Sequence, residues 1–191
     1  MLRILLLAAA LAVAACSGPE RPQFKSTDIT GADYAKDFSL TDHTGQPRRL
    51  ADFRGKVVTV FFGYTQCPDV CPTTLATMAE VLRLLGPDAA RVQVLFITVD
   101  PERDTPQLLA QYVPAFNPTF LGLYGDPAAT AAVARDFKVF YKKVGEGPNY
   151  TVDHSAGTFV FDPGGRLRLY VKHGESAAVI ADDIRQLLAG K

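Results

Sequence analysis

A short turn that carries two cysteines constrains this chain more than any other part of it. The turn lies within Phe61–Leu75 and contains Cys67 and Cys71. The apolar run Val57–Phe62 before it is rich in β-branched and aromatic residues, and predicts a strand buried on both faces. After the turn, apolar residues recur at helical spacing and predict an amphipathic helix: Leu75, Met78, Ala79, Leu82 and Leu85. A strand-to-helix turn with two thiols is a candidate site of chemistry.

Pro72 indicates where the two thiols lie. Proline suits the first turn of a helix because it has no N–H to donate, and it disfavours the helical conformation for the residue before it. We therefore expect Cys71 at the N-cap or just before it, and Cys67 in the preceding loop. Backbone amides and the positive end of the helix dipole would then face both sulfurs and favour the thiolate. A structural disulfide is the alternative, but a bridge closing so short a loop adds little stability.

The first residues predict export and a lipid anchor. Met1–Ala15 has a basic residue, Arg3, followed by an apolar segment too short to span a bilayer. Val13–Cys16 resembles the lipobox of bacterial lipoproteins, in which the cysteine is lipidated after cleavage; an ordinary cleavage site is the alternative. We predict a lipoprotein signal peptide over residues 1–15, lipid on Cys16, a flexible tether over residues 16–36 and one folded domain over residues 37–191. The domain would be anchored to a membrane of the bacterial cell envelope and face the periplasm.

Charge and composition exclude some classes of partner. The 191 residues include 20 Lys and Arg against 20 Asp and Glu, and no Trp. A chain without net charge or a basic cluster is not expected to bind nucleic acid. Its length suits one domain and an export signal.

The rest of the chain alternates strands and helices. Val92–Val99 predicts a second buried strand, which completes a βαβ unit and implies a parallel pair with a right-handed crossover. Thr44–Gly45 predicts the turn of an N-terminal hairpin, and a second antiparallel hairpin is expected from Thr158–Phe161 and Leu167–Val171. Further segments predict two short strands and three helices: Thr119–Leu123, Val139–Tyr141, Pro106–Phe116, Pro127–Phe137 and Ser176–Leu188. The element order and the cysteine turn together predict an α/β thioredoxin-like fold, with a central mixed sheet, flanking helices and an N-terminal hairpin.

Asp100 follows the second buried strand. Parallel strands end at the same edge of a sheet, where ligands bind. Asp100 is therefore a candidate to contact and orient the residues of the cysteine site. Asp104 or Thr105 is expected to cap the next helix, with Pro106 as its first residue.

His154 is the third candidate at the site. In a thioredoxin-like fold, the loop that holds it packs against the cysteine turn. Two thiolates and an imidazole could hold Zn²⁺ with an open position or, since thiolates suit it, Cu(I). A blue-copper centre is not expected because it needs two histidines and an axial methionine. A zinc hydrolase would have only Asp100 or Asp153 as a general base, and these two are also the candidates for supporting contacts to the metal ligands.

Three segments resemble the Sco/SenC family of copper-binding proteins: Gly63–Pro72, Val99–Thr105 and Tyr150–Ser155. The likeness covers about residues 37–188. It implies that Cys67, Cys71 and His154 bind copper, as Cu(I) and in some states Cu(II), and that the two cysteines form a redox-active pair. Many members have His where this chain has Gln66, a position that is not a copper ligand in the family.

The residues and the resemblance leave two functions open. The first is a metallochaperone, and the resemblance implies that it passes copper to the dinuclear centre in the copper-bearing subunit of cytochrome c oxidase, with other periplasmic copper or thiol proteins as further partners. The second is a thiol–disulfide oxidoreductase that keeps the partner's cysteines reduced. The chain is not predicted to be a conventional enzyme, and thiol–disulfide exchange is the one activity its residues suggest. A thiol peroxidase is disfavoured because the usual Pro-x-x-x-Thr-x-x-Cys arrangement is missing.

Overall fold

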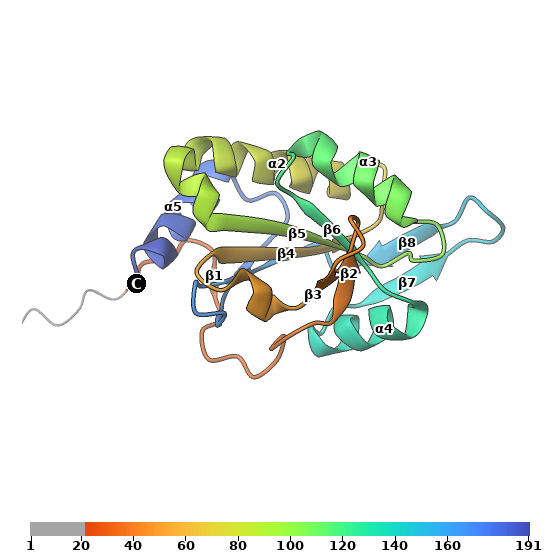
Figure 1. Ribbon diagram of the computed structural model, residues 1–191, viewed down its shortest axis with the longest axis horizontal. Helices are drawn as coiled ribbons and strands as arrows, with labels where there is room; N and C mark the ends of the chain where they lie inside the picture. The colour runs from red at the N-terminus through yellow and green to blue at the C-terminus, as the bar shows by residue number, and fades with distance from the viewer. Residues whose placement is uncertain (1–21) are drawn as a thin grey trace, which may run out of the picture.

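The structure, a computed structural model, describes residues 22–191 of the chain. Its centre is a mixed eight-stranded sheet with the strand order β1-β10-β9-β4-β5-β6-β2-β3 (Figure 1). Its strands in chain order are β1 Thr27–Asp28, β2 Leu40–Asp42, β3 Pro47–Arg48, β4 Val57–Gly63, β5 Val92–Thr98, β6 Leu121–Tyr124, β9 Thr158–Phe161 and β10 Leu167–Val171. The predicted central mixed sheet is therefore present.

Four α-helices of residues 22–191 flank this sheet. Helices α2, α3 and α5 lie over one face, and α4 lies on the other (Figure 1). Their bounds are α2 Val70–Leu85, α3 Pro106–Phe116, α4 Pro127–Asp136 and α5 Ala177–Leu188, and two 3₁₀ turns are η1 Leu50–Phe53 and η2 Gly86–Arg91. Each predicted helix is confirmed to within a residue or two, because proline or serine marks three of the starts and an apolar stripe marks each buried face.

The innermost strands place the cysteine turn. Strand β4 pairs in parallel with β5 from Val57↔Val92 to Gly63↔Thr98, and antiparallel with β9 on its other side. Every residue of β4 and β5 is buried, as their continuous apolar runs predicted. Because β4 and β5 are parallel, their carboxyl ends share one edge, which brings the cysteine turn and Asp100 to the same end of the sheet.

The N-terminal hairpin is also confirmed. Strands β2 and β3 pair antiparallel, with Leu40 opposite Arg48. The buried carboxylate of Asp42 holds the turn by accepting bonds from the backbone N–H of Thr44 at 2.8 Å and from the Arg48 Nε at 2.7 Å. The hairpin is thus stabilised by a buried, fully bonded aspartate as well as by its strand pairing.

Residues 22–36 differ from the flexible tether that the sequence predicts. The backbone N–H groups of Lys25 and Ser26 both donate to the buried carboxylate of Asp183, at 2.9 and 2.8 Å. Strand β1 then pairs with β10, and Ala35 is buried. The sequence of the segment is polar and turn-rich, but its backbone forms hydrogen bonds with Asp183 and with β10, which lie far along the chain. The predicted signal peptide, Cys16 and residues up to 21 lie outside the described part.

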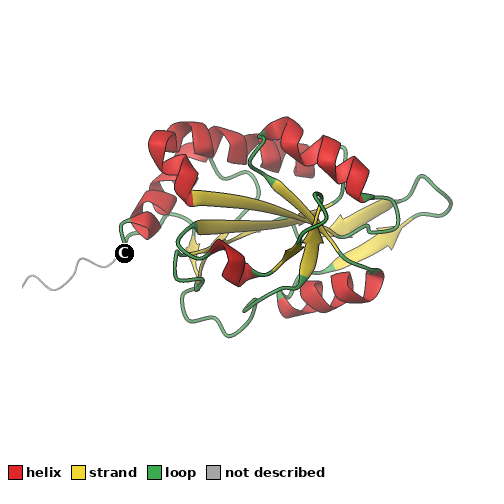
Figure 2. Ribbon diagram, viewed as in Figure 1, coloured by secondary structure: helices red, strands yellow, loops and turns green. Residues whose placement is uncertain are grey.

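A separate two-stranded ribbon projects from one end of the sheet (Figure 2). It is formed by β7 Tyr141–Val144 and β8 Thr151–His154, which pair with each other and with no strand of the main sheet. The sequence predicts a strand at Val139–Tyr141, which begins two residues before β7 begins and ends three residues before β7 ends, and treats the residues around His154 as a loop. His154 instead ends a strand. Within residues 22–191, no helix has both the length and the apolar character needed to cross a membrane.

Candidate metal centre

The cysteine turn joins the end of β4 to the start of α2. Helix α2 begins at Val70 with Asp69 as its N-cap, so Cys71 is its second residue rather than the predicted cap. Pro72 is then the third helical residue, where the N–H that proline lacks has no acceptor within the helix. The helix therefore includes Cys71 in its first turn, against the preference that proline imposes on the preceding residue.

The two thiols lie in different environments. Cys67 is partly exposed, whereas Cys71 is fully buried and its backbone N–H donates to the Cys67 Sγ at 3.4 Å. Burial raises the pKa of the Cys71 thiol, and this outweighs the opposing hydrogen bond from the backbone of Tyr64. Burial of the Cys71 thiol therefore opposes the effect expected from the helix N-terminus. A bound cation would replace the proton on that sulfur.

Gly63 is the last residue of β4 and allows the Cys71 sulfur to approach the strand. A Cβ at this position would lie 2.8 Å from the Cys71 Sγ and 2.8 Å from the ring of Phe96. Atoms do not approach this closely without displacement, so only glycine fits behind the sulfur.

His154 completes the site from the ribbon. Its Nε2 lies 3.6 Å from the Cys71 Sγ, and its ring packs edge-to-face on Phe61 and Tyr64 with centroids 6.0 Å away in each case. The Nδ1 lies 3.0 Å from the carbonyl oxygen of Ser155, which can only accept, so Nδ1 carries the proton. The lone pair of Nε2 therefore faces the thiols. Burial lowers the pKa of His154, which keeps the ring neutral and able to ligate.

The donor atoms of Cys67, Cys71 and His154 all lie within 4.8 Å of one another. Within residues 22–191 no other group of three or more His, Cys, Asp or Glu side chains could hold a metal ion. Two sulfurs and one neutral imidazole suit a soft cation such as Cu(I), and Zn²⁺ less specifically. Met78 lies on the buried face of α2, as its place in the apolar stripe predicts, and is not one of these donors. The residues present therefore fit copper.

The two aspartates predicted to support the site lie differently from each other. Asp100 is buried and accepts bonds from the Arg103 Nε and the Tyr150 hydroxyl, both at 2.5 Å. It bonds to neither the thiols nor His154. Asp153 is exposed on the opposite face of β8 from His154, because side chains alternate along a strand. Its charge opposes the effect of burial on the pKa of His154, although only as a smaller contribution.

Asp104 does not have the capping role for which the sequence makes it a candidate beside Thr105. Thr105 caps α3 by accepting from the N–H of Leu108, which leaves Asp104 free for other partners. The Asp104 carboxylate instead accepts bonds from the hydroxyl groups of Thr98 and Thr65, both at 2.6 Å. Burial raises the pKa of Asp104, and these hydrogen bonds partly offset that rise. The sequence held one indication of this role: Thr105 can cap the helix by itself, so the acidic residue before it is available for another partner.

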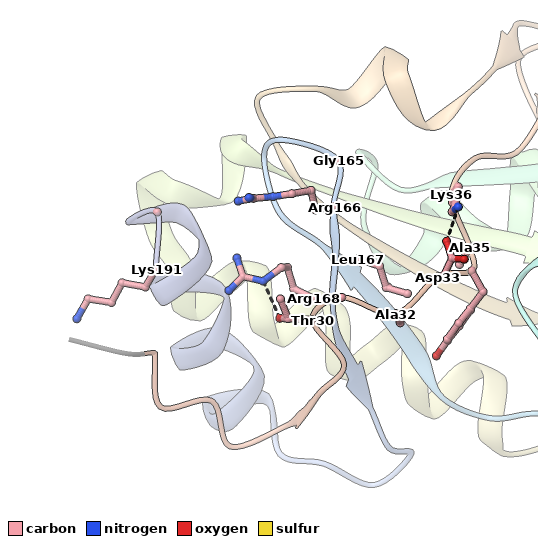
Figure 3. Close-up of a pocket in the computed structure, with 13 residues that line it drawn as sticks. Thr30, Ala32, Asp33, Ala35, Lys36, Gly165, Arg166, Leu167, Arg168 and Lys191 are labelled. Atoms are coloured by element: carbon pink, nitrogen blue, oxygen red, sulfur yellow. Dashed lines mark hydrogen bonds and ion pairs between the residues drawn. The ribbon is translucent and has the colours of Figure 1, made fainter. Parts of the chain in front are cut away.

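A cavity in the described chain lies away from this site. It has a volume of about 670 Å³ and lies where the N-terminal segment meets the start of β10 (Figure 3). Three of its basic side chains form ion pairs: Lys36 with Asp33, and Arg166 and Arg168 with Asp162. Arg168 also donates to the Thr30 hydroxyl at 2.9 Å. The cavity contains none of the three donor residues Cys67, Cys71 and His154.

Comparison with known proteins gives the family. The SCO1/SenC family model matches residues 26–189. The chain is 44% identical over 157 residues to the mitochondrial SCO2 homolog of Mus musculus, covering 80% of this chain and 62% of that protein. It is 37% identical over 160 residues to a SCO2-like protein of Rickettsia felis, covering 81% of this chain and 77% of the relative.

The chain belongs to the SCO1/SenC family.

Solved Sco structures share its fold. The copper-bound ScoI of Bradyrhizobium japonicum is 42% identical, with a TM-score of 0.74 over 80% of this chain and 98% of that one. The apo Sco1 of Thermus thermophilus is 43% identical, with a TM-score of 0.78 over 88% of this chain and 99% of that one. The predicted thioredoxin-like fold is confirmed.

Proposed function

We propose that this Sco protein is a copper chaperone that holds Cu(I) through the Cys67 and Cys71 sulfurs and the Nε2 of His154. The observation that carries the proposal is the convergence of these three donor atoms within 4.8 Å, with the imidazole lone pair directed at the thiols. A relative of 42% identity has been solved with copper bound, which supports copper over zinc. Cu(I) accepts the low coordination number that three protein ligands provide.

Copper is the cargo in this proposal, and the receiving partner is the copper-bearing subunit of cytochrome c oxidase. The family resemblance supports that partner. Partial exposure of Cys67 leaves one sulfur accessible to the thiols of an incoming protein, while Cys71 and most of His154 are covered. Other periplasmic copper or thiol proteins are further partners of the same chemistry.

Anchoring forms a second part of the proposal. A lipid on Cys16 would hold the chain at a membrane of the bacterial envelope, with the folded domain facing the periplasm. The mature chain then has few residues between the anchor and Lys25, whose backbone is already bonded to Asp183. The domain would therefore stay close to the membrane surface, within reach of a membrane-bound oxidase. Wild-type protein should fractionate with membranes and incorporate labelled lipid, and Cys16→Ser should lose the label.

Thiol–disulfide exchange is a second candidate function. It is favoured by the closeness of the two sulfurs, which lie within 4.8 Å of each other, and by the partial exposure of Cys67. An exposed thiolate can attack a partner disulfide and a neighbouring thiol can resolve the mixed disulfide. Closing a Cys67–Cys71 bridge would remove both thiolates and release copper, so the two functions exclude each other at any one moment.

Anaerobic titration of the reduced full-length chain tests the copper proposal. With a colorimetric Cu(I) chelator as competitor, we expect about one Cu(I) per chain, held in preference to Zn²⁺. Chain oxidised to the Cys67–Cys71 disulfide should take up none until it is reduced. Preferential binding of Zn²⁺, or full Cu(I) uptake by the oxidised chain, would contradict the proposed ligands.

A further inference from the structure

The His154 ligand belongs to a different sheet from the turn that carries the thiols. Cys67 and Cys71 follow β4, which is paired on both sides, whereas His154 ends β8, which pairs only with β7 (Figure 2). No strand-to-strand hydrogen bond therefore sets the position of the ribbon relative to the cysteine turn. His154 is joined to β9 by residues 155–157, and side-chain contacts of the ribbon supply the further restraint on its separation from the sulfurs.

Arg103 joins these two parts directly. Its Nη1 donates to the carbonyl oxygen of Tyr150 at 2.9 Å and to the side-chain oxygen of Gln66 at 3.1 Å. Tyr150 immediately precedes β8, and Gln66 immediately precedes Cys67. A third bond, at 3.3 Å, goes to the carbonyl oxygen of Pro148 in the β7–β8 connection. The Arg103 guanidinium thus contacts Gln66, which is next to Cys67, and Tyr150, which precedes the strand that ends at His154.

The Arg103 side chain is itself held in a fixed orientation. Its Nε donates to Asp100 at 2.5 Å, and its guanidinium carbon lies 3.5 Å from the ring centroid of Tyr150. The Tyr150 hydroxyl donates to the other oxygen of the same Asp100 carboxylate at 2.5 Å. Arginine has a planar group with several donors in fixed directions, so it can satisfy these partners together. Asp100 is buried at the end of β5, which ties the arrangement to the main sheet.

The neighbouring residue fixes the other side of the cysteine turn. Asp104 accepts from both the backbone N–H and the hydroxyl group of Thr65, at 3.0 and 2.6 Å, while it also bonds to Thr98 in β5. Arg103 and Asp104 therefore contact the consecutive residues Thr65 and Gln66. Of the turn and the ribbon, Asp104 thus bonds only to the turn, whereas Arg103 bonds to both.

We propose that Arg103 is a positioning residue that sets the distance between His154 and the two cysteine sulfurs, and so determines copper affinity without touching the metal. The inference rests on the proposed function. Other contacts also hold the ribbon: the bond from the Tyr150 hydroxyl to Asp100 at 2.5 Å, an ion pair of Lys143 with Glu102 at 3.1 Å, and a bond between the Tyr64 hydroxyl and the Val152 backbone. The ion pair is exposed at both ends and contributes little. Arg103 is the contact that reaches both ligand-bearing segments.

The test is the Arg103→Lys variant of the full-length chain. Lysine keeps the charge and can pair with Asp100, but it cannot bond to Gln66 and Tyr150 in the same geometry. Losing a group that orients a metal ligand typically costs about ten- to a hundred-fold in affinity, and we expect a Cu(I) affinity loss in that range. The matched control is Arg48→Lys, because Arg48 also pairs with a buried aspartate, Asp42, but lies in the N-terminal hairpin. The control should lower the melting temperature and leave Cu(I) affinity unchanged.

Two further measurements separate positioning from a general structural role. In the His154→Ala background, Arg103→Lys should cause no additional loss of Cu(I) affinity, because the ligand it positions is already absent. In the reduced metal-free protein, proton NMR should show contacts between the His154 ring and the rings of Phe61 and Tyr64. These contacts should weaken in Arg103→Lys while the spectrum of the main sheet stays native.

Equal Cu(I) affinity in wild type and Arg103→Lys would overturn the inference, as would the same affinity loss with and without His154. Unchanged ring contacts in the NMR spectra would overturn it without reference to copper. Failure of the proposed function would look different. In that case the wild type would bind no Cu(I), or His154→Ala would bind as tightly as wild type.

Discussion

The two halves of the metal centre are held in place by different kinds of interaction. The thiol half follows β4, whose residues are all buried and whose backbone is bonded to a strand on each side. The imidazole half lies on a ribbon that projects from the main sheet and is fastened to it by side chains such as Arg103 and Tyr150. A strand ladder distributes its stability over many bonds, whereas a side-chain cluster concentrates it in a few. We therefore expect substitutions in the two halves to differ in what they damage.

The largest expected effect is the loss of either thiol. Cys67→Ser and Cys71→Ser should each abolish tight Cu(I) binding and prevent formation of the intramolecular disulfide, because each reaction needs both sulfurs. Cu(I) titration and thiol trapping measure the two properties. Cys71→Ser should also lower the melting temperature more than Cys67→Ser, since its hydroxyl would be fully buried. Equal stability of the two variants would contradict the contrast in burial.

Loss of the imidazole should have a narrower effect. His154→Ala should weaken Cu(I) binding by at least about a hundred-fold, the upper end of the cost of losing an outer contact to a ligand. The Cys67–Cys71 pair should still form and break its disulfide, because exchange needs only the thiols and access. Chelator competition and thiol trapping measure these two properties.

The same variant separates the two candidate functions in cells. If copper delivery is central, His154→Ala should fail to assemble cytochrome c oxidase as completely as a cysteine variant does. Added copper should then partly restore assembly. Normal oxidase levels in His154→Ala, with failure of Cys67→Ser, would identify a disulfide reductase instead.

Gly63→Ala tests the thiol half through packing. The added methyl group would meet the Cys71 Sγ and the Phe96 ring at 2.8 Å, inside a strand that is paired on both sides. Overpacking of this kind costs about 1–3 kcal/mol. We expect a lower melting temperature together with weaker Cu(I) binding, because the sulfur must move. A drop in melting temperature with wild-type Cu(I) affinity would show that the sulfur position is not set by β4.

The smallest expected effect lies outside both halves, in the N-terminal hairpin. Burial would raise the pKa of Asp42, but hydrogen bonds from Thr44, Arg48 and the Gln46 backbone lower it to about 2. Because the pKa of Asp42 in the folded protein lies below the ordinary value of 3.8 for aspartate, this carboxylate stabilises the fold above about pH 4 and loses that contribution as the pH falls towards 2. The contribution is of order 1–2 kcal/mol.

The Asp42→Asn variant checks this prediction. Its unfolding free energy should fall less steeply between pH 4 and pH 2 than that of wild type, as followed by denaturant titration at each pH. Cu(I) affinity at neutral pH should not change, since the hairpin does not contact the site. Parallel stability curves for the two proteins would contradict the assignment.

Local patterns in the sequence were sufficient for the α/β class, the parallel pair and the two cysteines. The runs Val57–Phe62 and Val92–Val99 are short, almost wholly apolar and rich in β-branched and aromatic residues, which favours buried strands in the middle of a sheet. The helix after Cys71 follows from an apolar stripe at helical spacing. Periodicity of this kind depends on neighbours along the chain, which is why it can be read without a structure.

The tertiary structure decided the features that depend on distant partners. The pKa of Cys71 is raised because α2 and the sheet enclose it, although its place near a helix N-terminus suggested the opposite. Residues 22–36 are ordered by Asp183 and β10, far along the chain. The roles of Asp104 and Arg103 likewise require knowing that the turn after β5 lies beside the cysteine turn and the ribbon. Burial and hydrogen-bond partners are set by which segments meet in space, and sequence spacing alone does not specify them.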